Sequence, residues 1–267
     1  MSNDSSWTDT HAHLTDPDLL PQLDATLELA AEFNVKRLLC VSVDAHSIPP
    51  LLPLLDKPNI FGPNIFGSVG IHPNYSHQES SGDWERIESL FTHPKICALG
   101  ETGLDNYWKD SPWDTQMANF QRHLQASRTH SLPLIIHSRN CDDEMLACLR
   151  EDYRNGPLLG VMHSFCASLE HALAYIEMGL YISFSGMLTY KKNETLRDIA
   201  RKIPLDRLLV ETDAPYLSPE PKRSSRPNQP AYVAFTGKVL AELHNLTPEQ
   251  MAMKTTQNAL KLFSRMT

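Results

Sequence analysis

Trp7-Thr8-Asp9-Thr10-His11-Ala12-His13 places two histidines two residues apart near the N-terminus of this 267-residue chain. Side chains alternate between the two faces of a β-strand, so positions i and i+2 point the same way. His11 and His13 are therefore expected to project together from one strand end, close enough to bind one metal ion. A single pair of this kind is a weak signal, and its weight depends on the later strands.

Seven further apolar runs follow, separated mostly by segments whose apolar residues recur at helical spacing. They span residues 37–43, 66–71, 96–100, 133–136, 158–162, 180–184 and 207–210. This eightfold alternation predicts an α/β fold, a closed parallel (β/α)8 TIM barrel. One such barrel takes about 250 residues, so residues 1–267 are expected to form a single domain. The alternative, an open doubly wound sheet, usually has a glycine-rich phosphate turn where this chain has His-x-His.

The intervening segments predict helices, the first starting at Asp16-Pro17-Asp18 and the next lying in the Pro-rich segment after residue 43. The others are expected at 83–91, 114–129, 142–150, 169–178, 193–202, 232–244 and 248–264, the last being an extra C-terminal helix. The repeated tetrapeptide at 59–62 and 64–67 is interpreted as a loop insertion.

Composition narrows the class of protein. The net charge is −8 and no long basic run exists, which argues against broad coating of duplex nucleic acid. A metal centre would still attract a phosphate locally. The five cysteines form no Cys-x-x-Cys pair, and Cys40 and Cys97 lie in apolar runs, so we expect a reducing, cytoplasmic location. No secretory signal or run of about 18 apolar residues predicts export or membrane insertion.

Histidines and carboxylates stand at the ends of six of the eight expected strands. They are His11, His13, His72, Glu101, His137, His163 and Asp213. Barrel enzymes place their active sites on the face formed by these strand ends. The other histidines are assigned to surface or packing roles, with His123 and His130 expected to face solvent.

Four of these histidines with two carboxylates exceed what one tetrahedral ion needs. Two divalent ions about 3.5–4 Å apart, sharing a carboxylate, would use them all, and Zn, Mg or Mn suit such ligands. We expect Glu101 to bridge the ions. The ligands on its two sides would be His11, His13 and Asp213 on one, and His137 and His163 on the other. Water between the ions could attack an ester or phosphodiester, with Asp213 also taking its proton.

Several neighbours are candidates for contacts to substrate or ligands. His72 is expected to donate a hydrogen bond to a phosphate or to act as a general acid, the alternative being a structural role. Arg139 could clamp a phosphate oxygen or form a salt bridge. Glu211 and Asp105 are interpreted as carboxylates that orient the ligand histidines.

Two surface features near the expected site remain open between two interpretations. Tyr107 and Trp108 could stack an unpaired base, or they could be ordinary loop aromatics. Lys191 and Lys192 form a small basic spot after the seventh strand, interpreted as a solvated surface.

The motifs together resemble the TatD-related DNase family over nearly the whole chain. They are Asp9-Thr-His-Ala-His13, Gly70-Ile-His-Pro73, Gly100-Glu-Thr-Gly-Leu-Asp105, Ile136-His-Ser-Arg139, His163-Ser-Phe165, Phe184-Ser-Gly186, Glu211-Thr-Asp-Ala-Pro215 and Asn228-Gln-Pro-Ala-Tyr-Val233. The resemblance implies a metal-dependent hydrolase barrel of the amidohydrolase-like group with DNase activity, including 3′→5′ exonuclease action. It also implies that the ligands of two metal ions are His11, His13, Glu101, His137, His163 and Asp213. Asn74 and the run Asn106-Tyr107-Trp108 depart from the family pattern, where substrate should enter.

Three hypotheses follow. The first is a metal-dependent deoxyribonuclease that acts on DNA, at single strands or 3′ ends. The second is a hydrolase of a small amide, lactone or aminoacyl ester on the same centre, which the acidic surface favours mildly. The third is a non-catalytic scaffold barrel. A monomer is expected in each case.

Overall fold

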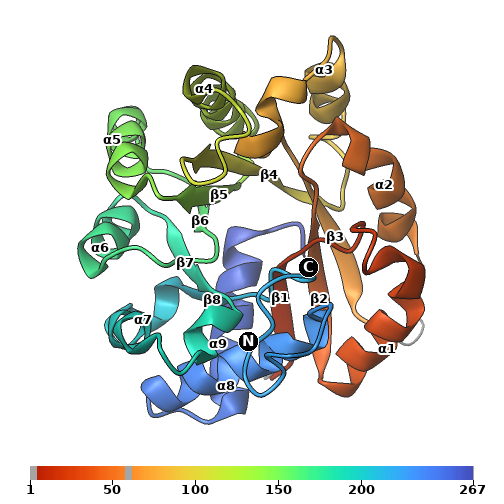
Figure 1. The fold of residues 1–267 in the computed structure, drawn as a ribbon, viewed down its shortest axis with the longest axis vertical. Coiled ribbons are helices and arrows are strands. Elements are labelled where there is room, and N and C mark those ends of the chain that lie inside the picture. The colour runs from red at the N-terminus through yellow and green to blue at the C-terminus, as the bar shows by residue number, and fades with distance from the viewer. Residues whose placement is uncertain (1–4, 58–61, 267) are drawn as a thin grey trace.

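The protein is described by a computed structural model over residues 5–57 and 62–266. Eight parallel strands form one sheet in the order of the sequence. They are β1 (Trp7–Ala12), β2 (Val35–Val41), β3 (Asn64–Val69), β4 (Ile96–Asp105), β5 (Leu134–Arg139), β6 (Gly160–Met162), β7 (Tyr181–Phe184) and β8 (Leu208–Val210). Figure 1 shows the strands as an inner ring with helices around them, which confirms the single-domain (β/α)8 TIM barrel.

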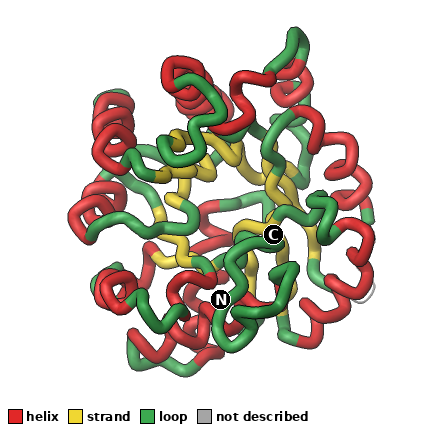
Figure 2. Tube along the Cα trace, viewed as in Figure 1, coloured by secondary structure: helices red, strands yellow, loops and turns green. Residues whose placement is uncertain are grey.

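Helices follow the strands, and all but the last lie around the outside of the ring, as the red and yellow segments of Figure 2 show. They are α1 (Leu23–Glu32), α2 (Ile48–Asp56), α3 (Asp83–Glu88), α4 (Trp113–His130), α5 (Asp142–Tyr153), α6 (Leu169–Glu177), α7 (Glu194–Ala200), α8 (Val233–Leu243) and α9 (Pro248–Leu262). None of the helices in the described part of the chain has the length and apolarity that crossing a bilayer requires.

The ring closes through the segment after β8 and not through a full ladder. Ala12 and Ala214 form an isolated parallel bridge, and the backbone N–H of His13 donates to the Ala214 carbonyl over 2.7 Å. The N–H of Asp213 donates in turn to the His11 carbonyl over 2.9 Å. The seam of the barrel therefore places two candidate ligand segments side by side.

The extra C-terminal helix α9 is part of the core. Its Leu262, with Phe263 and Met266 just beyond it, packs in one buried cluster with side chains from the strands, among them Leu39 and Ile135. In Figure 1 the blue C-terminal segment lies behind the middle of the ring. Burial of these side chains holds the strand ring together from one end.

Several local predictions are wrong. The helix expected at Asp16 starts at Leu23, because Asp16 instead accepts a bond from the Asp18 N–H in a turn and a short 3-10 helix, Leu20–Gln22, follows. The second copy of the repeated tetrapeptide, residues 64–67, is not a loop insertion but the start of β3. Residues 59–61 of the first copy lie outside the described residues.

The predicted solvent exposure of His123 is also wrong. The side chain is fully buried, whereas His130 is exposed as predicted. The His123 Nε2 accepts the N–H of Ile71 at 3.1 Å, and its Nδ1 donates to the Asn119 carbonyl at 2.8 Å. This histidine therefore ties α4 to the chain just after β3.

Strand β4 continues past its expected end. The ladder with β5 runs on to Asp105 and Arg139, with a register shift between Leu99 and Thr102. Gly100 lies inside that shift at φ +132, where a Cβ would stand 2.7 Å from the Ile135 carbonyl oxygen. Only glycine is tolerated there. The irregularity lets Glu101 stand inside a strand, and not at its end, with its side chain among the candidate ligands.

Candidate metal centre

The carboxylate of Glu101 lies at the middle of the candidate site and is 3% exposed. Its Oε1 is 2.8 Å from Nε2 of His163 and 2.9 Å from Nδ1 of His137. Its Oε2 is 3.4 Å from Nε2 of His11 and 3.7 Å from Nε2 of His13. The two oxygens thus face two separate pairs of imidazoles, which is the division expected for a bridging carboxylate.

Asp213 joins the Oε2 side of the site. Its Oδ1 is 3.4 Å from Nε2 of His13 and 3.7 Å from Nε2 of His11. Potential ligand atoms of these three residues all lie within 4.8 Å of one another, as do those of His11, Glu101 and His163. The structure therefore brings together all six residues that the sequence proposed as metal ligands.

The backbone around Asp213 is held in an uncommon conformation. Asp213 has φ +56, a left-handed value that aspartate tolerates better than most residues. Asp9, fully buried on β1, accepts bonds from the N–H and hydroxyl of Thr212 at 2.9 and 2.5 Å. Asp9 therefore fixes the segment that carries Asp213 against the strand that carries His11.

Oxygen acceptors lie behind three of the imidazoles, and two of these acceptors form hydrogen bonds that fix the position of a proton. Nδ1 of His13 donates to the Val41 carbonyl at 3.1 Å, and Nε2 of His137 donates to Oδ2 of Asp105 at 3.1 Å. Nδ1 of His163 lies 3.3 Å from Oε1 of Glu211, without hydrogen-bond alignment. An imidazole that gives its proton to an acceptor behind it presents a lone pair on its other nitrogen, as metal ligands do.

The imidazole nitrogens on the inner side of the rings converge on Glu101. Nδ1 of His137 and Nε2 of His163 are 3.2 Å apart, and both are within 2.9 Å of Oε1 of Glu101. On the other side, Nε2 of His11 and Nε2 of His13 are 3.1 Å apart. Although burial opposes the shift, the neighbouring carboxylates raise the pKa values of His13, His137 and His163, that of His163 well above its ordinary value. The cluster therefore favours positive charge, which a divalent ion would supply in place of the protons, so the donor set fits divalent metal ions.

The electrostatics of the cluster keep its carboxylates ionised. Burial alone would raise the pKa of Glu101, but His163, His72 and His11 hold it well below its ordinary range. Burial opposes the same shift at Asp213, and the hydrogen bond from His13 with the neighbouring imidazoles lowers that pKa. Both carboxylates are therefore available to cations at neutral pH.

His72 has the opposite arrangement of protons. The N–H of Asn74 donates to its Nδ1 at 3.1 Å, so in the neutral ring the proton is on Nε2. That Nε2 points into the site, 3.5 Å from Oε1 of Glu101. Although atoms of His72, Glu101 and His137 come within 4.8 Å, His72 presents a donor to them and not a lone pair. Burial lowers its pKa to about 3, in keeping with a neutral ring.

The loop after β4 carries the exposed aromatics near this centre. Oδ1 of Asp105 accepts the N–H groups of Tyr107 and Trp108 at 2.8 and 3.0 Å, whose side chains are 51% and 57% exposed. The guanidinium of Arg139 lies over the Tyr107 ring at 4.3 Å and over Trp108 at 5.6 Å. Arg139 forms no ion pair with any described residue, so the contact to a phosphate oxygen stays a prediction.

Sequence reasoning gave no role to Asp9 or Asn74. Asp9 belongs to the same i, i+2 alternation as His11 and His13, so the motif itself indicates that its side chain lies on the same face of the strand. Asn74 donates from Nδ2 to Oδ2 of Asp105 at 3.2 Å and through its backbone to His72. The departure from the family pattern at Asn74 thus supports the groups around the centre.

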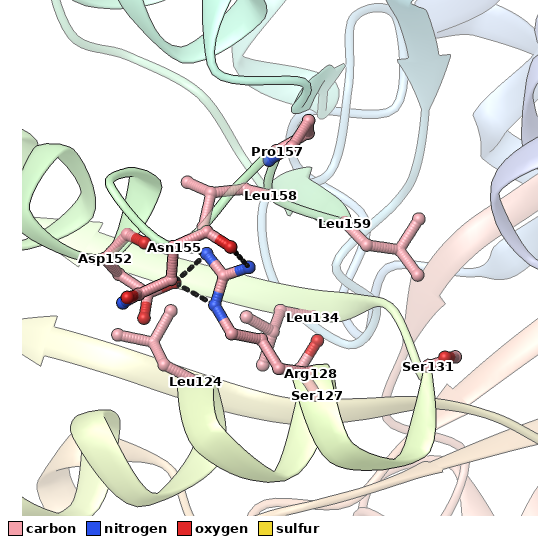
Figure 3. A pocket seen from close by; sticks show the side chains of 10 residues that line it. All are labelled: Leu124, Ser127, Arg128, Ser131, Leu134, Asp152, Asn155, Pro157, Leu158 and Leu159. Carbon is pink, nitrogen blue, oxygen red and sulfur yellow. Dashed lines mark hydrogen bonds and ion pairs between the residues drawn. The ribbon is translucent and has the colours of Figure 1, made fainter.

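A separate pocket lies at the opposite end of the barrel and is drawn in Figure 3. It is bounded by the end of α4 and the start of β5, where Leu134 stands. Its one cation, Arg128, is neutralised by Asp152 and also donates to the carbonyls of Asn155 and Gly156. No unpaired charge there is available to a substrate, in contrast to the metal centre.

Comparison with known proteins identifies the family. A family model described as TatD related DNase matches residues 8–264. The chain is 39% identical over 260 residues to an uncharacterized metal-dependent hydrolase, YcfH, of Escherichia coli, covering 96% of this chain and 94% of that protein. It is 34% identical over 255 residues to the uncharacterized metal-dependent hydrolase YabD of Bacillus subtilis, covering 96% and 98%.

The fold comparison agrees with the sequence comparisons. The crystal structure of YjjV, a TatD homolog from Escherichia coli, superposes with a TM-score of 0.89 at 27% identity, covering 98% of this chain and 99% of the other. The chain therefore belongs to the TatD-related family of metal-dependent hydrolases.

Proposed function

We propose that this chain is a two-metal deoxyribonuclease that hydrolyses phosphodiester bonds, acting as a 3′→5′ exonuclease on single-stranded DNA ends. The observation that carries the proposal is the convergence of imidazole nitrogens on both oxygens of Glu101. Zn, Mg and Mn are the candidate ions. The proposed ligands are His11, His13, Glu101, His137, His163 and Asp213.

Two ions held there would lower the pKa of a water molecule and neutralise charge developing on the phosphate. Asp213, ionised and partly open to solvent, would accept the proton of the attacking water. His72 would donate from Nε2 to a non-bridging phosphate oxygen. The structure favours this role over that of general acid, because the ring is neutral and its remaining proton is weakly acidic. Asp105 and Glu211 would keep His137 and His163 oriented.

The surroundings of the centre support a nucleic-acid substrate. Tyr107 and Trp108 offer exposed ring faces beside the mouth, and stacking on such rings accepts any unpaired base. Arg139, lying over Tyr107, is placed to meet a phosphate oxygen or a stacked base. A paired base cannot present its face in this way, which favours single strands over duplexes.

The test is digestion of end-labelled single-stranded and duplex oligonucleotides by metal-reconstituted enzyme, read by product length. We expect products shortened one nucleotide at a time from the 3′ end of the single strand, and no products with chelator. Glu101→Ala should abolish hydrolysis while circular dichroism shows an unchanged fold. A folded Glu101→Ala variant with wild-type rates would contradict the bridging role.

The same experiment separates the alternatives. Turnover of a carboxylic ester or lactone without cleavage of DNA would favour a hydrolase of a small amide, lactone or aminoacyl ester. Absence of metal after gentle purification would favour a scaffold. We further propose that residues 1–267 act as one domain, monomeric and cytoplasmic; all five cysteines are free, in keeping with a reducing location.

A further inference from the structure

Two loops on the mouth of the barrel carry a group of cations that the metal centre does not use. One loop follows β7 and the other follows β8, so both leave from strand ends on the face of the metal centre. We call this group the basic rim. Its members are Lys191, Lys192, Lys222, Arg223 and Arg226. None of them forms an ion pair with any other residue in 5–57 or 62–266, although the chain has a net charge of −8.

The two loops are fixed in place and joined to each other. Arg197 of α7 donates to the carbonyls of Leu188, Tyr190 and Lys191 at 3.2, 2.6 and 3.1 Å. The N–H of Glu220 in the second loop donates to the Thr189 hydroxyl in the first at 2.7 Å. The cations therefore project from a preorganised surface, which reduces the entropy lost when a ligand binds.

The Tyr190 ring packs against one cation of the basic rim. The Arg223 guanidinium lies 3.4 Å from the centre of the Tyr190 ring. This contact holds the Arg223 guanidinium in place without neutralising its charge.

We propose that the basic rim binds the phosphates of a single nucleic-acid strand on the 5′ side of the bond being hydrolysed. This inference rests on the proposed function and adds to it the need for a strand several nucleotides long. The platform of Tyr107 and Trp108 follows β4, which lies four positions from β8 in the ring of strands (Figure 1). A strand would thus have its bases stacked on one side of the mouth and its phosphates paired on the other.

The test compares two variants that each lose four positive charges. The rim variant is K191Q/K192Q/K222Q/R223Q. The matched control is K202Q/K238Q/K254Q/K261Q, whose four lysines are exposed elsewhere and have no ion pair with a described residue. Binding of a fluorescent single-stranded 16-mer is measured by anisotropy over a range of salt concentrations, in chelator so that no hydrolysis occurs. Hydrolysis of the 16-mer and of a dinucleotide is measured with metal.

We expect the rim variant to bind about tenfold or more weakly, and the slope of log K against log salt to fall by about 3, since each single-strand phosphate contact contributes about 0.7. Its KM should rise for the 16-mer and stay the same for the dinucleotide, and the control should match wild type throughout. Equal effects in rim and control variants, or wild-type binding by the rim variant, would overturn the inference while leaving DNA hydrolysis standing. If wild type binds the 16-mer but hydrolyses neither DNA substrate, the proposed function fails while the rim stands as a binding site.

Discussion

Replacing Asp105 with asparagine should weaken metal binding without unfolding the protein. In wild type, Oδ1 accepts two backbone N–H groups, those of Tyr107 and Trp108, and Oδ2 accepts Nε2–H of His137 and Nδ2–H of Asn74. The new amide would keep its oxygen on the two backbone donors and turn its NH2 group toward His137. Two donors would then face each other, unless the His137 proton moved to Nδ1.

That movement is what damages the site. Nδ1 of His137 is 2.9 Å from Oε1 of Glu101 and is the nitrogen that would hold the ion. A proton there removes the lone pair. Loss of the partner that orients a ligand histidine lowers metal affinity by about 10–100-fold, or about 1.4–2.7 kcal/mol. The fold should be preserved, because the two backbone donors keep an acceptor.

The assay is calorimetric titration of metal-stripped protein with Zn²⁺ and Mn²⁺, alongside thermal unfolding of the stripped forms. The matched control is Asp83→Asn. Asp83 is a buried carboxylate at the start of α3 that accepts the Ser80 N–H, and it is none of the residues of the candidate site. The control variant should bind metal as wild type does. Metal affinity within twofold of wild type in a well-folded Asp105→Asn would refute the assignment of the His137 proton.

Three other predictions concern ions, substrate and pH. Removing metal should lower the unfolding temperature, since saturation at 100 times Kd stabilises by about 2.7 kcal/mol, and an unchanged calorimetric transition would argue against a built centre. Trp108→Ala should raise KM for a single-stranded oligonucleotide about tenfold while metal affinity, measured by titration, stays constant. Burial lowers the pKa of His123 from 6.5 to about 4. The unfolded chain therefore binds that proton first, and stability falls as pH drops from 6.5 toward 4. Denaturant unfolding at about pH 5 should show wild type losing about 2 kcal/mol that His123→Gln keeps.

The barrel could be predicted from the sequence because each strand coincides with a local run of apolar residues. The sequence was also sufficient to bring the ligands together, since a barrel collects all its strand ends on one face. It failed where a residue's position depends on long-range contacts. His123 looks solvent-facing on a polar helix, and only its bond to the Ile71 N–H reveals why it is buried. The continuation of β4 past Glu101 likewise depends on pairing with β5.

The direction of each imidazole proton was equally beyond the sequence. His72 and His137 have identical side chains, and both stand at or near strand ends beside Glu101. What distinguishes them is whether a backbone donor or a carboxylate lies behind the ring, which the fold alone determines. That difference separates a hydrogen-bond donor for substrate from a group that can hold a cation.

A buried carboxylate supports the candidate site on each side of the barrel mouth. On the β4 side, Asp105 orients His137 and anchors the aromatic loop with one carboxylate, so His137 and the loop are held as a unit. On the seam side, Asp9 fixes Thr212 and with it the left-handed turn of Asp213. Glu101, between them, is the only described residue whose two oxygens face both groups of imidazoles. A change at either support should therefore reach the chemistry through a single ligand, and loss of Glu101 should disable both halves together.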